Sequence, residues 1–151
     1  MEPLDLRSTP PRSPRAKLAG IVFTARLVDK LRASLSGGDL NGYFPFVGFS
    51  EVWSHYTAVD LHELRDVVAA APSERDVERW LEDRTATVDR ERVNDKMQRF
   101  ETSRTPPQYL ATFEATYPAE LRRAHDVIFE MLDADDARLY QTAGCEVHTP
   151  P

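Results

Sequence analysis

The sequence predicts an all-α fold, a single compact domain of about six or seven helices. In most segments apolar side chains recur at intervals of three and four residues, the spacing of one helical face. No segment alternates apolar and polar side chains over the length of a strand. No internal repeat or low-complexity linker divides the 151 residues, and a chain of this length can bury a sizeable core as one domain.

The first helix is expected from Pro14 to Leu35. Ser13 is a favourable N-cap, and proline fits the first helical position because its missing N–H would be unpaired there. The helix should end at Ser36-Gly37-Gly38, where glycine can adopt the left-handed conformation. The expected organisation is an extended N-terminal arm at residues 1–13, a helical domain at residues 14–144 and a frayed tail at residues 145–151.

An aromatic stretch at residues 43–49 follows, where Pro45 and Gly48 disfavour a central strand. Helix signals dominate the rest of the chain. Asp60 followed by Glu63 resembles a capping box, in which both side chains satisfy free N–H groups. The further helices are expected to begin near Ser50, Asp60, Ser73, Thr87, Pro107 and Pro118.

The net charge of −6 is unevenly distributed. Residues 1–35 hold seven Lys/Arg and three Asp/Glu, a balance of +4, which leaves −10 for the remainder. A surface this acidic repels polyanions, so no nucleic-acid partner is expected. A small anionic ligand held by a local cluster of arginines is compatible with the charge.

Cysteine content and hydropathy indicate the compartment. Cys145 is the only cysteine, which excludes an internal disulfide and any zinc site built on several thiolates. No apolar run approaches the roughly 20 residues that span a bilayer, and the acidic N-terminus does not resemble a signal peptide. We therefore expect a cytoplasmic protein with no membrane partner.

Arg26, Asp29 and Lys30 form the first candidate site, because they lie within about one helical turn of each other near the apolar stripe. In one interpretation they belong to a solvated face with ion pairs worth about 0.2–0.5 kcal/mol each. In the other, Arg26 and Lys30 bind the charge of a ligand, and a partly buried Asp29 acts as a general base.

Arg12 and Arg15 flank the expected start of the first helix, where free N–H groups and the helix dipole attract anions. One interpretation is an anion-binding site. The other is that both arginines pair with acidic residues elsewhere in the chain.

The aromatic stretch and the helix after it hold a second candidate site. Such a cluster is either core or the wall of a small-molecule pocket. In the pocket interpretation Trp53 and Tyr56 contact the ligand. His55 titrates beside it, and Tyr43 hydrogen-bonds a developing oxyanion.

Metal and cofactor sites have no support in the sequence. No pair of histidines or carboxylates has the spacing of metal ligands, and glycine-rich phosphate loops and nucleophile elbows are absent. We therefore expect no metal and no cofactor.

The N-terminal segment carries a family-like pattern: Ser13-Pro14-Arg15, Gly20, an Arg-x-x-Asp-Lys-x-Arg stretch at residues 26–32, Gly37-Gly38 and Tyr43. Over residues 11–43 the chain resembles a bacterial family whose members have no assigned role, domain of unknown function family 5069. A weaker similarity lies at residues 132–136. The resemblance implies an α-helical domain, supplies no catalytic residues, and makes the Arg26/Asp29/Lys30 region the expected place of any shared site. The string at residues 53–56 departs from the family pattern.

These observations predict a helical protein with a site for a small anionic or polar metabolite. If it is an enzyme, the residues favour general acid–base chemistry of the isomerase, cyclase or dehydratase type. The alternative is a non-catalytic helical protein that binds a partner or forms a homodimer. Its docking surface would be the narrow apolar seam of the charged helix at residues 87–102, formed by Val93, Met97 and Phe100.

Overall fold

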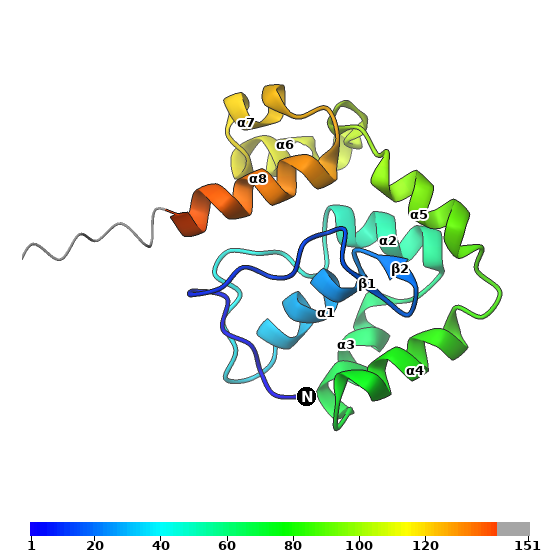
Figure 1. The fold of residues 1–151 in the computed structure, drawn as a ribbon. Helices are drawn as coiled ribbons and strands as arrows, with labels where there is room; N and C mark the ends of the chain where they lie inside the picture. Colours follow the sequence, from blue (N-terminus) through cyan, green and yellow to red (C-terminus); the bar gives the residue numbers. More distant parts are fainter. Residues whose placement is uncertain (142–151) are drawn as a thin grey trace, which may run out of the picture.

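The computed structural model describes residues 1–141, and its mostly helical architecture confirms the all-α prediction (Figure 1). Eight α-helices, one short 3-10 helix and one two-stranded hairpin make up this part of the chain. The helices are α1 (Thr24–Ala33), α2 (Phe49–Thr57), α3 (Leu61–Ala70), α4 (Glu74–Arg84), α5 (Arg90–Gln98), α6 (Pro107–Thr116), α7 (Ala119–Ala124) and α8 (Ile128–Gln141). The strands are β1 (Lys17–Leu18) and β2 (Ile21–Val22), and the 3-10 helix η1 is Thr102–Arg104. Cys145 and the expected tail at residues 145–151 lie outside the described residues.

Across residues 1–141, no helix combines the length and the apolar character needed to cross a membrane.

A β-hairpin occupies the first part of the segment where the sequence predicted a helix, so that prediction is wrong before Thr24. Ala19 and Gly20 form its two-residue turn with φ of 52° and 74°, as in a type I′ turn. A right-handed helix cannot contain these angles. The Nε of Arg90 donates to the Ala19 carbonyl at 3.0 Å, and the Nδ2 of Asn94 donates to the Gly20 carbonyl at 2.9 Å. These tertiary contacts from α5 override the local helical periodicity.

Helix α1 is the centre of the molecule, and nine of its ten residues are buried. It packs against α3 and the hairpin, and the ion pair between Arg26 and Asp136 joins it to α8, which lies above it in Figure 1. The fully buried Trp53 of α2 donates its indole N–H to the Thr24 hydroxyl at 2.9 Å. Because α1 has almost no solvent-facing side, its charged residues lie inside the protein and need partners there.

Helices α2 to α5 begin near the positions expected from the sequence. The Asp60 carboxylate caps α3 by accepting the N–H groups of His62 and Glu63. Helix α5 is shorter than expected, and its seam residues Val93 and Met97 are buried where α5 contacts β2 and α2. This part of the seam is therefore core, and it is not available to a partner.

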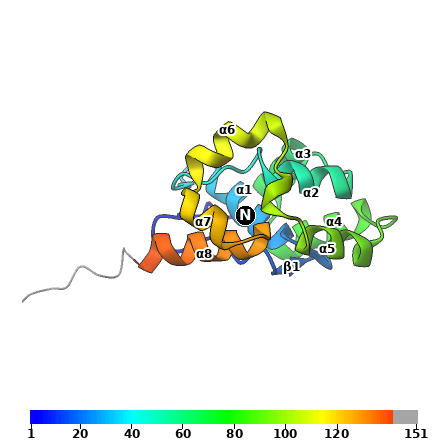
Figure 2. The same ribbon diagram turned by 90° about the horizontal axis from the view of Figure 1, so that it is seen from above.

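The last helix expected from Pro118 is divided into α7 and α8 by residues 125–127. The backbone N–H of Thr102 donates to the Asp126 carbonyl at 2.8 Å, and that of Ile128 donates to the Phe100 carbonyl at 2.9 Å. These bonds satisfy groups that a continuous helix would have used, and the chain turns there. Helix α7 lies beside α8, and α6 lies on the other side of α7 from α8 (Figure 2).

Candidate functional site

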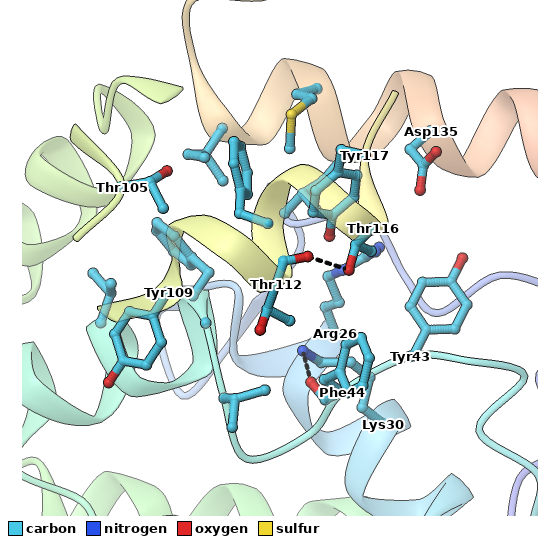
Figure 3. Close-up of a pocket in the computed structure, with 18 of the residues that line it drawn as sticks. Arg26, Lys30, Tyr43, Phe44, Thr105, Tyr109, Thr112, Thr116, Tyr117 and Asp135 are labelled. Atoms are coloured by element: carbon cyan, nitrogen blue, oxygen red, sulfur yellow. Dashed lines mark hydrogen bonds between the residues drawn. The ribbon is translucent and has the colours of Figure 1, made fainter. Parts of the chain in front are cut away.

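A cavity of about 280 Å³ lies beside α1, between the loop at residues 41–48, α2, α6 and α8. Its walls are largely apolar and aromatic, with contributions from Phe23, Phe49, Phe100, Phe113, Met131 and Leu132. Figure 3 shows the polar side chains that reach into it from α1, α6 and α8. A concave, largely apolar space with a few convergent polar groups is the usual form of a small-molecule site.

Lys30 of α1 lies on the floor of this cavity and is only 6% exposed. Its Nζ donates to the Phe44 carbonyl at 3.0 Å and to the Ser50 Oγ at 2.9 Å, and it lies 4.9 Å from the centre of the Phe23 ring (Figure 3). Both hydrogen-bond partners are neutral, and within residues 1–141 no carboxylate forms an ion pair with Nζ.

Burial lowers the pKa of the Lys30 ammonium well below its ordinary value of 10.5. The positive charge of Arg26 lowers this pKa further, and the negative charge of Asp136 opposes the shift. The net shift is toward the neutral amine, which has a lone pair that an ammonium lacks.

Arg26, one turn before Lys30, forms a buried ion pair with Asp136 of α8. Its Nη1 and Nη2 donate to the two carboxylate oxygens at 2.7 and 3.2 Å, and Arg26 is 2% exposed. The Tyr43 hydroxyl donates to the same carboxylate at 2.6 Å. Burial and this hydrogen bond both raise the pKa of Tyr43, so its hydroxyl stays protonated. This wall of the cavity is therefore polar but electrically balanced.

Tyr117, which directly follows α6, faces Arg26 from the opposite wall, and its hydroxyl points into the cavity (Figure 3). Burial raises the pKa of Tyr117 to about 12. A phenol that remains protonated at neutral pH can donate a hydrogen bond to a ligand oxygen.

The cavity mouth is apolar. Phe44 and Val47 of the loop and Leu139 of α8 are 47%, 41% and 41% exposed, and all three line the cavity. Asp135 and Arg138 also line it, joined by an ion pair of 2.7 Å.

Three of the residues singled out from the sequence come together in this cavity: Arg26, Lys30 and Tyr43. Arg26 and Lys30 share one side of α1, and Tyr43 reaches them from the following loop. Arg26 and Lys30 are close because they are four residues apart on one helix, and Tyr43 is close because it belongs to the loop that follows α1.

Asp29 lies outside the cavity lining. Its carboxylate accepts bonds from the backbone N–H and guanidinium of Arg12, the latter at 2.9 and 3.0 Å. The same guanidinium donates to Glu74 at 2.9 and 2.6 Å. This cluster ties the N-terminal arm to α1 and α4.

Four further residues expected at the site lie elsewhere. Arg15 forms a surface ion pair with Asp133 at 2.6 Å. Trp53 is part of the core, and His55 is exposed on α2. Tyr56 packs on the outside of the core, with the Lys96 Nζ 5.5 Å from its ring centre. None of the four lines the cavity.

Sequence reasoning missed Asp136, Tyr117 and Phe113. Asp136 lies in the weaker family-like string at residues 132–136, and an acid on a buried helical face requires a partner. This need for a partner is the sequence signal that could have identified Asp136. Nothing local in the sequence indicated that Tyr117 and Phe113 reach the same cavity.

No group of three or more His, Cys, Asp or Glu side chains in the described part of the chain is arranged to hold a metal ion.

Comparison with known proteins adds a family but no relative of known activity. No curated protein matches the chain. The family described as Domain of unknown function (DUF5069) matches residues 8–138, a range that includes α1, Asp136 and every residue that lines the cavity except Leu139. Since the match covers most of the sequence, the chain belongs to the DUF5069 family.

Proposed function

We propose that the protein binds a small polar molecule in the cavity beside α1 and acts on it by cofactor-independent acid–base chemistry. The observation that carries the proposal is Lys30, a buried amine with neutral partners on the floor of an apolar cavity. Burying a lysine is costly, and within residues 1–141 no ion pair of Nζ offsets the cost. Residues with burial-perturbed pKa values in a cavity are candidates for acid–base roles.

The size of the cavity suggests the size of the ligand. A cavity of about 150 Å³ holds a benzene ring, so a cavity of about 280 Å³ has room for about two rings or an equivalent chain. The aromatic walls favour an apolar body. Since Arg26 is already neutralised by Asp136, the polar part of the ligand is better matched as a neutral oxygen function than as a strong anion.

The polar groups divide into a proton acceptor, Lys30, and a hydrogen-bond donor, Tyr117, because the Tyr43 hydroxyl is already bound to Asp136. The neutral Lys30 amine accepts a proton from a carbon or oxygen of the ligand. Tyr43 and Tyr117 keep their protons, and Tyr117 can stabilise negative charge that develops on the ligand oxygen. This division suits an isomerisation, a cyclisation or a dehydration.

The binding half of the proposal is tested by thermal unfolding with phenol, 2-naphthol, indole, 2-naphthoate and 2-acetylnaphthalene. Compounds that bind the folded state should raise Tm. Thr116→Trp places a large side chain in the cavity from α6 and should abolish the shift. Leu110→Trp puts the same residue on an exposed position of α6 and should preserve it. Equal Tm shifts in both variants would contradict binding in this cavity.

The acid–base half is tested by proton exchange. Ketones that bind the protein, such as 2-acetylnaphthalene, are incubated with it in D2O, and loss of the NMR signal of the ketone's α-protons is followed. The wild-type protein should accelerate the exchange of this α-proton for deuterium. Lys30→Met should abolish the acceleration, whereas Lys17→Met makes the same change at an exposed lysine and should retain it. Acceleration that survives in Lys30→Met would overturn the assignment of Lys30 as the base.

A further inference from the structure

We propose that Lys30 is also a nucleophile, whose Nζ forms an imine with an aldehyde or ketone bound in the cavity. The inference rests on the proposed function, because the same cavity must hold the ligand, and it specifies the ligand as a carbonyl compound. An acid–base lysine only exchanges protons, whereas this one becomes covalently attached.

The hydrogen bonds of Lys30 are suited to a neutral amine. A neutral amine has two N–H groups and one lone pair. The Phe44 carbonyl and the Ser50 Oγ are within 3.0 and 2.9 Å of Nζ and accept two N–H bonds. This leaves the lone pair, and Lys30 lines the cavity. An ammonium would have a third N–H, for which the hydrogen bonds within residues 1–141 include no third acceptor, and the centre of the Phe23 ring lies 4.9 Å from Nζ.

The charged residues near Lys30 are already paired with each other. Asp136, the closest source of negative charge, is bound by Arg26 at 2.7 and 3.2 Å and by Tyr43 at 2.6 Å. Arg26 remains positive and opposes a second positive charge at Lys30. Burial also lowers the pKa of Lys30, in agreement with this geometry. Lysines activated in this way, by desolvation and a neighbouring cation, are those that form Schiff bases.

The reaction balances without any co-reactant. The Nζ lone pair attacks the carbonyl carbon and the C–O π electrons move to oxygen, which gives a carbinolamine after proton transfer. The oxygen leaves as water with the two protons that came from the amine, and the product is a C=N bond. Tyr117 lines the same cavity as a protonated phenol that can hydrogen-bond the departing oxygen.

The surroundings also suit the product. Uptake of one proton gives an iminium ion with a single N–H, for which the Phe44 carbonyl and the Ser50 Oγ compete. The Phe23 ring lies where its face can stabilise the positive charge.

The chain provides its own control, because it contains only three lysines. Lys17 and Lys96 are exposed, whereas Lys30 is buried. At pH 7 only about one in 2,500 ordinary lysine side chains is unprotonated. A reagent that needs the neutral amine should therefore select Lys30.

The test is reductive trapping of the intact folded protein with 2-naphthaldehyde or benzaldehyde and sodium cyanoborohydride at pH 7. Peptide mapping by mass spectrometry then measures the secondary amine at each lysine and at the N-terminal amine. We expect Lys30 to be modified at least about tenfold more than Lys17 or Lys96. The selectivity should disappear in urea, and Lys30→Met should show only the background at the other amines.

A parallel measurement separates failure of this inference from failure of the proposed function. 2-Naphthalenemethanol and benzyl alcohol have the same rings without a carbonyl, and their binding is followed by thermal shift. If the alcohols bind and the aldehydes do not label Lys30 in preference to Lys17 and Lys96, the imine is excluded while the ligand site stands. If no alcohol or aldehyde shifts Tm and Lys30 is not selected, both proposals are overturned.

Discussion

Replacing Lys30 by methionine should make the stability difference between the two proteins depend on pH. In the folded protein burial holds the pKa of Lys30 well below 10.5, whereas in the unfolded chain the side chain titrates near its ordinary value. Between these two pKa values the unfolded lysine carries a proton that the folded lysine lacks. The unfolded state then binds more protons, so the stability of the wild type relative to Lys30→Met rises with pH.

The slope follows from the proton difference. One proton corresponds to about 1.4 kcal/mol in the free energy of unfolding per pH unit, and the rise ends near the unfolded pKa of about 10.4. A separate, pH-independent offset comes from the variant itself. Methionine leaves the Phe44 carbonyl and the Ser50 hydroxyl without the Lys30 bonds, at about 1–3 kcal/mol for a buried group left unsatisfied.

The assay is urea unfolding of both proteins from pH 7 to pH 10, followed by circular dichroism. Tyr43 and Tyr117 have raised pKa values in the folded protein and titrate at about pH 10 only in the unfolded chain. Both tyrosines are present in both proteins, so their contribution cancels in the difference. A difference that stays constant from pH 7 to pH 10 would show that the amine keeps its proton on folding. In that case neither the base nor the nucleophile assigned to Lys30 would be available.

Other parts of the fold give three further expectations. Arg26→Met or Asp136→Leu should each lower the free energy of unfolding by about 3–5 kcal/mol, because the remaining charge stays buried. The double variant should lose clearly less than the sum of the two single losses. Additive losses in urea titrations would contradict an energetic coupling between the two residues. Asp60→Ala removes the N-cap of α3 and should cost about 1 kcal/mol, so an unchanged urea midpoint would contradict it. Gly20→Ala places a side chain at φ 74° with its Cβ 3.1 Å from the Arg90 Cδ, and thermal unfolding should show a loss of roughly 1–2 kcal/mol; an equal or higher Tm would show that the turn adapts.

Elements fixed by neighbouring residues were predictable from the sequence. Asp60 caps α3 because its carboxylate reaches the N–H groups of the next turn, an interaction within three residues. The hairpin was not predictable in this way. The left-handed angles at Ala19 and Gly20 are stabilised by Arg90 and Asn94, more than 70 residues later in the sequence.

The residues of the candidate site show the same difference between local contacts, which the sequence predicts, and long-range contacts, which it does not. Arg26 and Lys30 could be placed together from helical spacing alone. Asp29 was a reasonable partner for Arg26 by the same rule, but α1 is buried on nearly all sides and its two faces find different partners. Asp29 pairs with Arg12 of the arm, and Arg26 pairs with Asp136, 110 residues away. Only the tertiary structure decides between such partners.

The buried charge of α1 also has a consequence for the order in which the protein can be completed during synthesis. Arg26 is made early, yet the carboxylate that balances it belongs to α8, and the arm residue Leu6 accepts a bond from Tyr140, 134 residues later. Until α8 has emerged, desolvating α1 would strand a positive charge in the core. The native counterion of this buried arginine therefore becomes available only once α8 has been synthesised, which couples burial of the central helix to completion of the last described helix.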